Sequence, residues 1–172
     1  MNFTQAIVRK PGQSIISGLS ASGWDVPDYP TACEQHRCYI QALEACGLSV
    51  HILPAEEAWP DSTFVEDVAV LTPHCAIITA PGTESRRGEV AAIAPVLESY
   101  YTDIHRISPP GTLEGGDIMQ VGSHYYIGVS NRTNQSGAEQ LIAILEKYGM
   151  SGSMVTVPNL LHLKTGVTHP GC

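Results

Sequence analysis

The sequence predicts an α/β fold built from repeated strand-strand-helix-strand modules, and two observations support this prediction. First, two similar segments lie about fifty residues apart: Phe64–Val70 and Leu113–Met119 each place acidic residues before an apolar strand. Second, the likeness continues along the chain in matched pairs, His74 with His124, Ile77 with Ile127, Thr83 with Thr133 and Glu89 with Glu139. A period of this length is typical of a supersecondary unit that buries its apolar face only by packing on its neighbours.

Composition and charge limit the classes of function. The chain has 172 residues, 43% of them hydrophobic, which suits one domain with a substantial core. The formal net charge of −8 argues against nucleic acid as a partner, because nine basic residues do not form the required clusters. An acidic protein is better suited to a small cationic ligand. We find neither a signal-like start nor a stretch long enough to span a bilayer, so we expect no membrane partner and a cytoplasmic location.

The five cysteines are odd in number and show no CxxC spacing. This pattern favours reduced thiols over a disulfide framework. Cys33, Cys38 and Cys46 fall on one helical segment, where we expect them to be small packing residues. Cys75 lies on a predicted strand, and we expect it to pack there too.

The first module, residues 1–63, begins with an apolar strand at Ala6–Val8. Residues 13–30 are rich in Gly, Ser and Pro, which predicts a long loop, either a lid or binding loop or an ordinary mobile surface loop. A capping box at Thr31–Glu34 predicts a helix that ends at Gly47. Val50–Leu53 then returns as a strand.

The second and third modules, residues 64–112 and 113–160, repeat one pattern. We expect a helix after residues 84–89 in the second, with Pro95 causing a kink or a displaced helix start. In the third, a capping box at Ser136–Glu139 predicts a helix that ends at Gly149. The expected strands are 68–71, 76–79 and 104–107 in the second module and 118–121, 125–128 and 154–157 in the third. A further module starts at residues 161–172.

Five segments, taken in order, carry a family resemblance: Phe64–Asp67, Glu84–Glu89, Glu114–Met119, Asn131–Asn134 and Leu161–Gly166. Together they resemble dimethylarginine dimethylaminohydrolase over nearly the whole chain. That family belongs to the pentein superfamily, with the arginine deiminases and amidinotransferases. The resemblance implies an αβ-propeller of five modules around a central site. The chain would supply about three of the five, an incomplete propeller, and this agrees with the repeat.

The resemblance implies hydrolysis of N-omega-methylated arginines to citrulline and methylamines through a thiouronium on a cysteine. Charged acceptors are needed to hold a planar cation. By resemblance His162 is the general acid and base and Glu114 shares the catalytic role. The residues implied to bind the small guanidino substrate are Asp61, Glu66 and Asp67 around the cation and Arg86 and Arg132 on its α-carboxylate.

Each of these residues also has a plainer structural interpretation. Asp67 and Asp117 could cap strand ends, and Arg86 could pair with Glu89 across a helical turn. A lone histidine in an apolar segment is usually a satisfied core residue. Each plainer interpretation holds for a residue taken singly, but the ordered set favours the family site.

The sequence departs from the family at its end. In the family the nucleophilic cysteine lies near the end of a chain that continues well beyond the segment matching His162, whereas here ten residues follow. We therefore expect a truncated chain that lacks the family nucleophile, and we expect Cys172 not to replace it. Missing modules would expose strand edges, which predicts a homo-oligomer.

Two alternatives to an active methylarginine hydrolase remain open. The chain could be a non-catalytic remnant that binds cationic ligands or a protein partner, or it could be an enzyme of the arginine deiminase type. The segment Glu84–Glu89 favours the methylarginine branch. We expect no cofactor and no metal, because no motif supports a metal, a nucleotide or a flavin. In particular, Gly115 and Gly116 are not spaced for phosphate binding.

Overall fold

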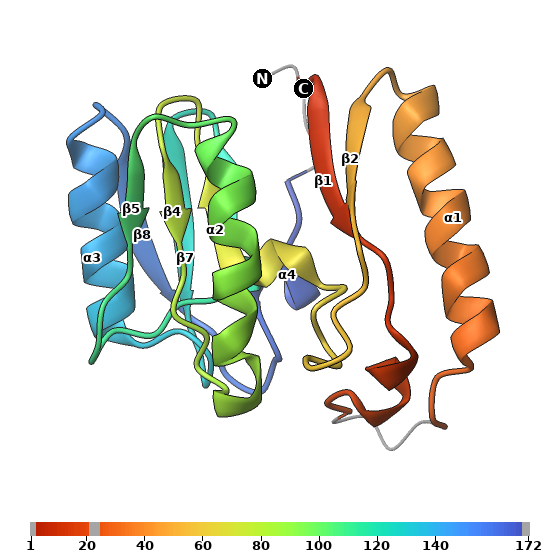
Figure 1. The fold of residues 1–172 in the computed structure, drawn as a ribbon. Helices are drawn as coiled ribbons and strands as arrows, with labels where there is room; N and C mark the ends of the chain where they lie inside the picture. The colour runs from red at the N-terminus through yellow and green to blue at the C-terminus, as the bar shows by residue number, and fades with distance from the viewer. Residues whose placement is uncertain (1–2, 21–24, 170–172) are drawn as a thin grey trace. The chain divides into compact units, whose positions relative to one another are not determined.

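The computed structural model describes residues 3–20 and 25–169 and divides into two compact units, Met1–Val65 and Glu66–Cys172. The first unit is a β-α-β unit (Figure 1). Its strands β1 (Gln5–Arg9) and β2 (Ser49–Leu53) pair in parallel, and helix α1 (Tyr29–Ala45) connects them. Parallel neighbours require such a crossover. Residues 13–17, placed in the expected loop, form a short 3-10 helix.

Helix α1 starts earlier than predicted. Its N-cap is Asp28, whose carboxylate accepts a hydrogen bond from the Thr31 backbone N–H at 3.0 Å. The capping box expected at Thr31 is therefore wrong. Pro30, which the sequence placed in the loop, falls in the first turn of the helix. A proline at that position costs no intrahelical hydrogen bond and is therefore compatible with the helix.

Helix α1 has no buried residue, and its half-buried positions, such as Ala32, His36, Ile40 and Leu43, follow a helical stripe. Cys38 and Cys46 lie off this stripe and are exposed, so the expectation that they pack is wrong for both. Cys33 is half-buried. All cysteines in the described part of the chain are free thiols.

The second unit contains two modules of the same order, each with strands, a helix and a further strand (Figure 1). The module expected at residues 64–112 contains six elements. These elements are η2 (Val65–Val68), β3 (Ala69–Leu71), β4 (Ala76–Ile78), η3 (Glu84–Glu89), α2 (Val90–Glu98) and β5 (Ile104–Arg106). Those of the next are η4 (Gly115–Asp117), β6 (Ile118–Val121), β7 (His124–Val129), α3 (Gln135–Glu146) and β8 (Ser151–Thr156), before a short helix α4 (Leu163–Gly166). Here η denotes a 3-10 helix.

Strand pairing confirms the repeat. In each module the first two strands are antiparallel and the third joins the second in parallel, giving the orders β3-β4-β5 and β6-β7-β8. A bridge between Ala80 and Leu113 connects the modules, with the Leu113 N–H donating to the Ala80 carbonyl at 2.8 Å.

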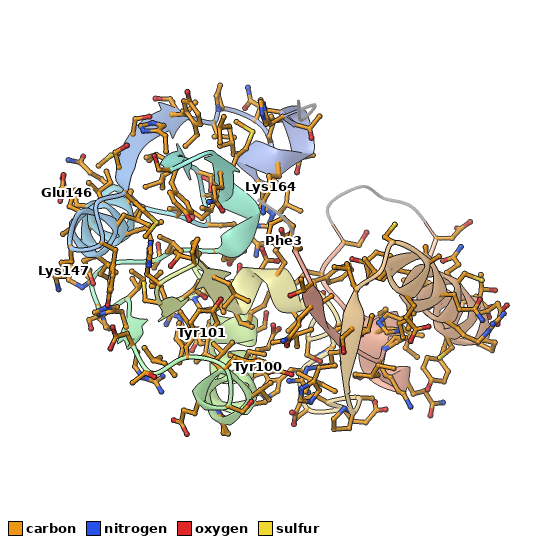
Figure 2. The ribbon with its side chains drawn as sticks, turned by 90° about the horizontal axis from the view of Figure 1, so that it is seen from above. Phe3, Tyr100, Tyr101, Glu146, Lys147 and Lys164 are labelled. Atoms are coloured by element: carbon orange, nitrogen blue, oxygen red, sulfur yellow. The ribbon has the colours of Figure 1, made fainter. Side chains whose placement is uncertain are left out.

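The two helices of this unit begin differently from the prediction. Helix α2 starts only at Val90, after the 3-10 turn η3, and still contains Pro95. Helix α3 is capped by Asn134, whose side chain accepts from the Gly137 N–H at 2.8 Å, so the capping box expected at Ser136 is wrong. Figure 2 labels the residues at the ends of these helices, Tyr100 and Tyr101 after α2, and Glu146 and Lys147 as the last residue and the C-cap of α3.

A continuous core joins the two modules. Ile77 of β4, Ile127 of β7 and Leu141 and Leu145 of α3 are completely buried in it. Cys75 belongs to the same core, which confirms that it packs. No helix of the described residues is both long enough and apolar enough to cross a membrane. The core holds the 3-10 turns η2 and η4 in place at the start of each module, where the acidic residues lie.

Candidate functional site

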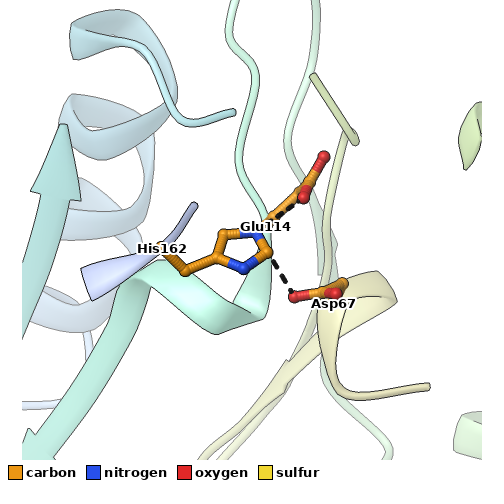
Figure 3. A group of neighbouring side chains, drawn as sticks. All are labelled: Asp67, Glu114 and His162. Carbon is orange, nitrogen blue, oxygen red and sulfur yellow. Dashed lines mark hydrogen bonds and ion pairs between the residues drawn. The ribbon is translucent and has the colours of Figure 1, made fainter. Parts of the chain in front are cut away.

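Three side chains far apart in the sequence meet in the second unit. The Nε2 atom of His162 lies 2.8 Å from Oε2 of Glu114 and 3.9 Å from Oδ1 of Asp67 (Figure 3). The histidine is the residue before α4, and the carboxylates come from η2 and from the residue before η4. All three are buried. The structure thus brings together three residues that the family resemblance assigned to one site.

Glu114 is completely buried, and several donors compensate for the loss of water around its carboxylate. Besides His162, the Gly82 N–H donates to Oε1 at 3.1 Å. The Arg132 guanidinium lies 3.3 Å from Oε2. The Glu114 backbone N–H also donates to the hydroxyl of Thr133 at 3.1 Å. The glutamate is therefore held in one orientation.

Asp67 is held by the neighbouring guanidinium of Arg86. The Arg86 Nη1 donates to Oδ2 of Asp67 at 2.6 Å, while Nε and Nη2 bind both oxygens of Glu89. Arg86 is buried, and the pairing with Glu89 that the sequence allowed is present. Arg132 is more accessible, with 18% of its side chain exposed.

Two glycines let the chain pass close to these side chains. A Cβ on Gly115 would lie 2.0 Å from the Glu66 carbonyl oxygen. A Cβ on Gly116 would lie 2.6 Å from the His162 Nδ1, and the Gly116 N–H donates to Oδ1 of Asp67 at 2.8 Å. At these glycines the backbone packs against the chain itself, the Glu66 carbonyl at Gly115 and the His162 ring at Gly116.

The charges around His162 favour its protonated form. Three of the four buried carboxylates nearby pair with guanidinium groups, Asp67 and Glu89 with Arg86 and Glu114 with Arg132. The fourth, Asp117, accepts hydrogen bonds from the Ser130 hydroxyl and the Leu163 N–H. Burial alone would lower the pKa of His162, but the hydrogen bond to Glu114 and the charges of Asp67, Asp117 and Glu114 raise it above 6.5.

The same interactions act on Glu114 in the opposite direction. Burial would raise the pKa of Glu114, but the hydrogen bond from His162 and the charges of Arg132, His162 and Arg86 lower it below 4.5. The two shifts of pKa therefore both favour the ion pair of an imidazolium with a carboxylate. Such a pair can hold a cationic ligand and deliver a proton to it.

One oxygen or nitrogen atom each of Asp67, Glu114 and His162 lies within 4.8 Å of the others, which raises the question of a metal. Both carboxylates already accept hydrogen bonds from guanidinium groups, and the His162 Nε2 is bound to Glu114. The atoms that a metal would need are thus already engaged in hydrogen bonds with neighbouring residues.

The matches with known proteins identify the family. The family model of eukaryotic N,N dimethylarginine dimethylhydrolase matches residues 29–162. The chain belongs to the dimethylarginine dimethylaminohydrolase family. It is 51% identical to the dimethylarginine dimethylaminohydrolase of Pseudomonas aeruginosa over 97% of its own length and 66% of the relative's. For the dimethylarginine dimethylaminohydrolase of Streptomyces coelicolor the identity is 38%, over 98% and 66% of the two chains.

Solved structures give the same result. A mutant dimethylarginine dimethylaminohydrolase from Pseudomonas aeruginosa, complexed with citrulline, matches with a TM-score of 0.97 and 50% identity, over 98% of this chain and 67% of that one. The N-terminal domain of a cyanobacterial arginine dihydrolase matches with a TM-score of 0.79 and 14% identity, over 89% of this chain and 58% of that one, which shows a shared α/β fold alone. The chain spans about two thirds of the length of the curated dimethylarginine dimethylaminohydrolases that it matches.

The remaining predicted residues have other partners. Glu66 is mostly exposed and forms an ion pair with Lys164 of α4. Asp61 belongs to the first unit, where its carboxylate accepts a hydrogen bond from the Leu19 N–H at 3.0 Å. Its role in binding stays a prediction. Cys172, the residue weighed as a nucleophile, lies outside the described residues.

Sequence reasoning missed the partners of Asp117, which it noted only as a possible strand-end cap. This buried carboxylate accepts hydrogen bonds from the Ser130 hydroxyl and from the backbone of Leu163. It also missed Thr133, although the repeat matches Thr133 with Thr83 and so gave a signal. No sequence signal marked Ser130.

Proposed function

We propose that this chain carries the guanidinium-binding and proton-transfer groups of a hydrolase that converts N-omega-methylated arginine to citrulline and methylamine. The observation that carries this proposal is the completely buried Glu114, with its carboxylate 2.8 Å from the His162 Nε2. A buried carboxylate suits a planar cation, and a histidine with a raised pKa suits a proton donor.

The chemistry follows from these groups together with a thiolate. The thiolate attacks the guanidinium carbon, and the bond to the methylated nitrogen breaks as His162 donates a proton to the departing amine. A thiouronium then remains on the sulfur. His162, now neutral, takes a proton from water, the hydroxide adds to the same carbon, and the thiolate leaves to give citrulline. Overall, one water is consumed and one methylamine is released.

Asp67 and Glu114 would hold the guanidinium nitrogens, and Glu66 and Asp61 would complete the group around the substrate. Arg132 is the better candidate for the α-carboxylate, because its side chain is partly exposed, whereas the three donor nitrogens of Arg86 are engaged by Asp67 and Glu89. Both arginines stay proposed substrate-binding residues.

The source of the thiolate is the open part of this proposal. Cys75 is the one cysteine among the described residues of the second unit, and it lies in the core, where burial raises the pKa of its thiol. It is thus a poor nucleophile. Cys172, or the further residues that the longer relatives possess, would have to supply the sulfur.

The test is citrulline release from asymmetric dimethylarginine by the purified chain, beside Glu114→Gln and Cys172→Ser. Release that is lost in both variants supports the hydrolase with Cys172 as nucleophile. Binding of citrulline without any release supports the alternative of a cationic-ligand module. A folded chain that neither binds citrulline nor releases it contradicts the proposal. Release of ammonia from unmethylated arginine, measured in parallel, would favour the arginine deiminase type.

A five-module propeller, a homo-oligomer and a cytoplasmic location also stay predictions. The repeated modules and the likeness to pentein structures support the propeller. A gel-filtration mass equal to one chain at micromolar concentration would contradict the homo-oligomer.

A further inference from the structure

Asp117 is a completely buried carboxylate at the end of η4, and the proposed reaction does not use it. Its Oδ2 accepts a hydrogen bond from the Ser130 hydroxyl at 2.7 Å. Its Oδ1 accepts one from the backbone N–H of Leu163 at 2.9 Å. Leu163 directly follows His162 and is the first residue of α4. The carboxylate therefore binds the chain at the residue next to the histidine.

The same contact, an aspartate that accepts a backbone hydrogen bond from the next module, occurs in both repeats. Asp67, the match of Asp117 in the preceding module, accepts a backbone hydrogen bond from Gly116 at the start of the following module. Asp117 likewise accepts one from Leu163, at the start of the segment that follows its own module. In both places an aspartate in a 3-10 turn connects one repeat to the next.

The two aspartates differ in their remaining partners. Asp67 is paired with the guanidinium of Arg86, whereas the hydrogen-bond donors to Asp117 in the described structure are the neutral Ser130 hydroxyl and Leu163 amide. A buried charge without a hydrogen-bonded cation acts strongly on nearby titratable groups. His162 is such a group, since the charge of Asp117 is among the causes that raise its pKa.

The carboxylate also has little room to move. A Cβ on Gly128 of β7 would lie 2.8 Å from the Asp117 Oδ1 and 2.8 Å from the Leu163 Cβ. A glycine is thus required where β7 passes this contact. The strand, the carboxylate and the first residue of α4 are packed directly on one another, so the hydrogen bond to Leu163 is fixed by its surroundings.

We propose that Asp117 is a positioning residue that fixes the backbone after His162 and so holds the imidazole against Glu114. The proposal rests on the proposed function, in which His162 transfers protons. The charged groups that act on His162 come from the segments packed around it: Asp67, Glu114 and Asp117, with Arg86 and Arg132 bound to two of these carboxylates. Asp117 would act through His162 and would not touch the substrate.

The first test compares Asp117→Asn, which keeps the size and an oxygen acceptor for Leu163 but removes the charge, with Asp117→Ala, which removes the acceptor as well. We expect the pKa of His162, followed by NMR titration of its imidazole, to fall, and any citrulline release to lose kcat with little change in KM. The matched control is Asp103→Asn. Asp103 also accepts a hydrogen bond, from the Tyr148 hydroxyl, but this contact is exposed. The control should leave the titration of His162 unchanged. A folded Asp117→Ala protein in which His162 titrates as in the wild type, with an unchanged kcat, would overturn the proposal.

The second test needs no variant. In the wild-type chain the Leu163 amide should exchange with solvent at least about tenfold more slowly than an unstructured amide, because it donates to a buried charge. Free exchange at Leu163 overturns the proposal even where Asp117→Asn does not fold. If the chain neither binds citrulline nor releases it while the pKa of His162 still depends on Asp117, the proposed function fails and the positioning role stands.

Discussion

Replacing Gly116 with alanine tests how closely the backbone of η4 packs on the proposed proton donor. The added carbon would lie 2.6 Å from the His162 Nδ1 and 2.9 Å from the Asp67 Oδ1, whereas ordinary contacts begin at 3.4 Å. The imidazole must therefore retreat by most of an ångström. Its Nε2 lies 2.8 Å from Glu114, so this movement stretches the hydrogen bond beyond a useful length.

The size of the effect follows from these two changes. Overpacking costs about 1–3 kcal/mol, and losing a hydrogen bond to a charged group costs about 1.5–3 kcal/mol. Because the ring can relieve the overlap by giving up the hydrogen bond, the two costs do not add fully, and we expect a loss of about 2–4 kcal/mol in the free energy of unfolding. The pKa of His162 should fall as well.

Urea unfolding measures the first quantity and NMR titration of His162 the second. Gly122→Ala is the matched control: its added carbon meets no atom within 4 Å, but the positive φ of 61° strains an alanine by about 1–2 kcal/mol. The control should lose stability and leave His162 unchanged. If Gly116→Ala keeps wild-type stability and a wild-type titration of His162, the proposed contact between Gly116 and the imidazole is wrong.

Three further predictions concern the same unit. The raised pKa of His162 contributes stability that is fully present below about pH 6.5 and is lost as the pH rises through the pKa of the folded state. Urea unfolding across this range should show that loss in the free energy of unfolding. In Glu114→Gln the free energy of unfolding should depend less on pH. Replacing Arg132 with alanine should weaken citrulline binding about tenfold or more in titration calorimetry, provided that Arg132 holds the α-carboxylate; unchanged affinity would remove it from the proposed site. Replacing Asn134 with alanine should lower the free energy of unfolding by about 1–2 kcal/mol, because the Gly137 and Thr112 amides lose their acceptor.

The repeat was predictable because it leaves two independent traces in the sequence. Apolar runs recur at strand spacing, and the acidic pairs before them recur after about fifty residues. The structure gives each run the same pairing in both modules, antiparallel and then parallel. Local patterns decide such elements, so sequence reasoning can find them.

The helix starts were harder to predict, because several residues that can cap a helix lie close together. Asp28 and Thr31 both suit an N-cap, as do Asn134 and Ser136. In both cases the residue nearer the N-terminus is the cap, because the first turn extends farther than the apolar stripe indicates. The stripe reports burial, and the first residues of both helices, such as Pro30 and Thr31 of α1 and Gln135 of α3, are exposed.

The site was only partly predictable, for a reason of geometry. Family motifs pointed to Asp67, Glu114 and His162, and the structure brings these three together. The link from Ser130 through Asp117 to Leu163 depends on where β7 and α4 pass one another, which no local pattern records. The exposure of Cys38 and Cys46 is a similar case, since small apolar residues on a helix are buried only where another element covers them.

The contacts that build the site connect residues nearly one repeat apart. The hydrogen bond from His162 to Glu114 spans 48 positions, that from Leu163 to Asp117 spans 46 and that from Gly116 to Asp67 spans 49. Contacts of this span close large loops, so they form late in folding, after the strands and helix within each module have paired. We therefore expect the pair of His162 and Glu114 to be assembled only in chains whose modules have already docked.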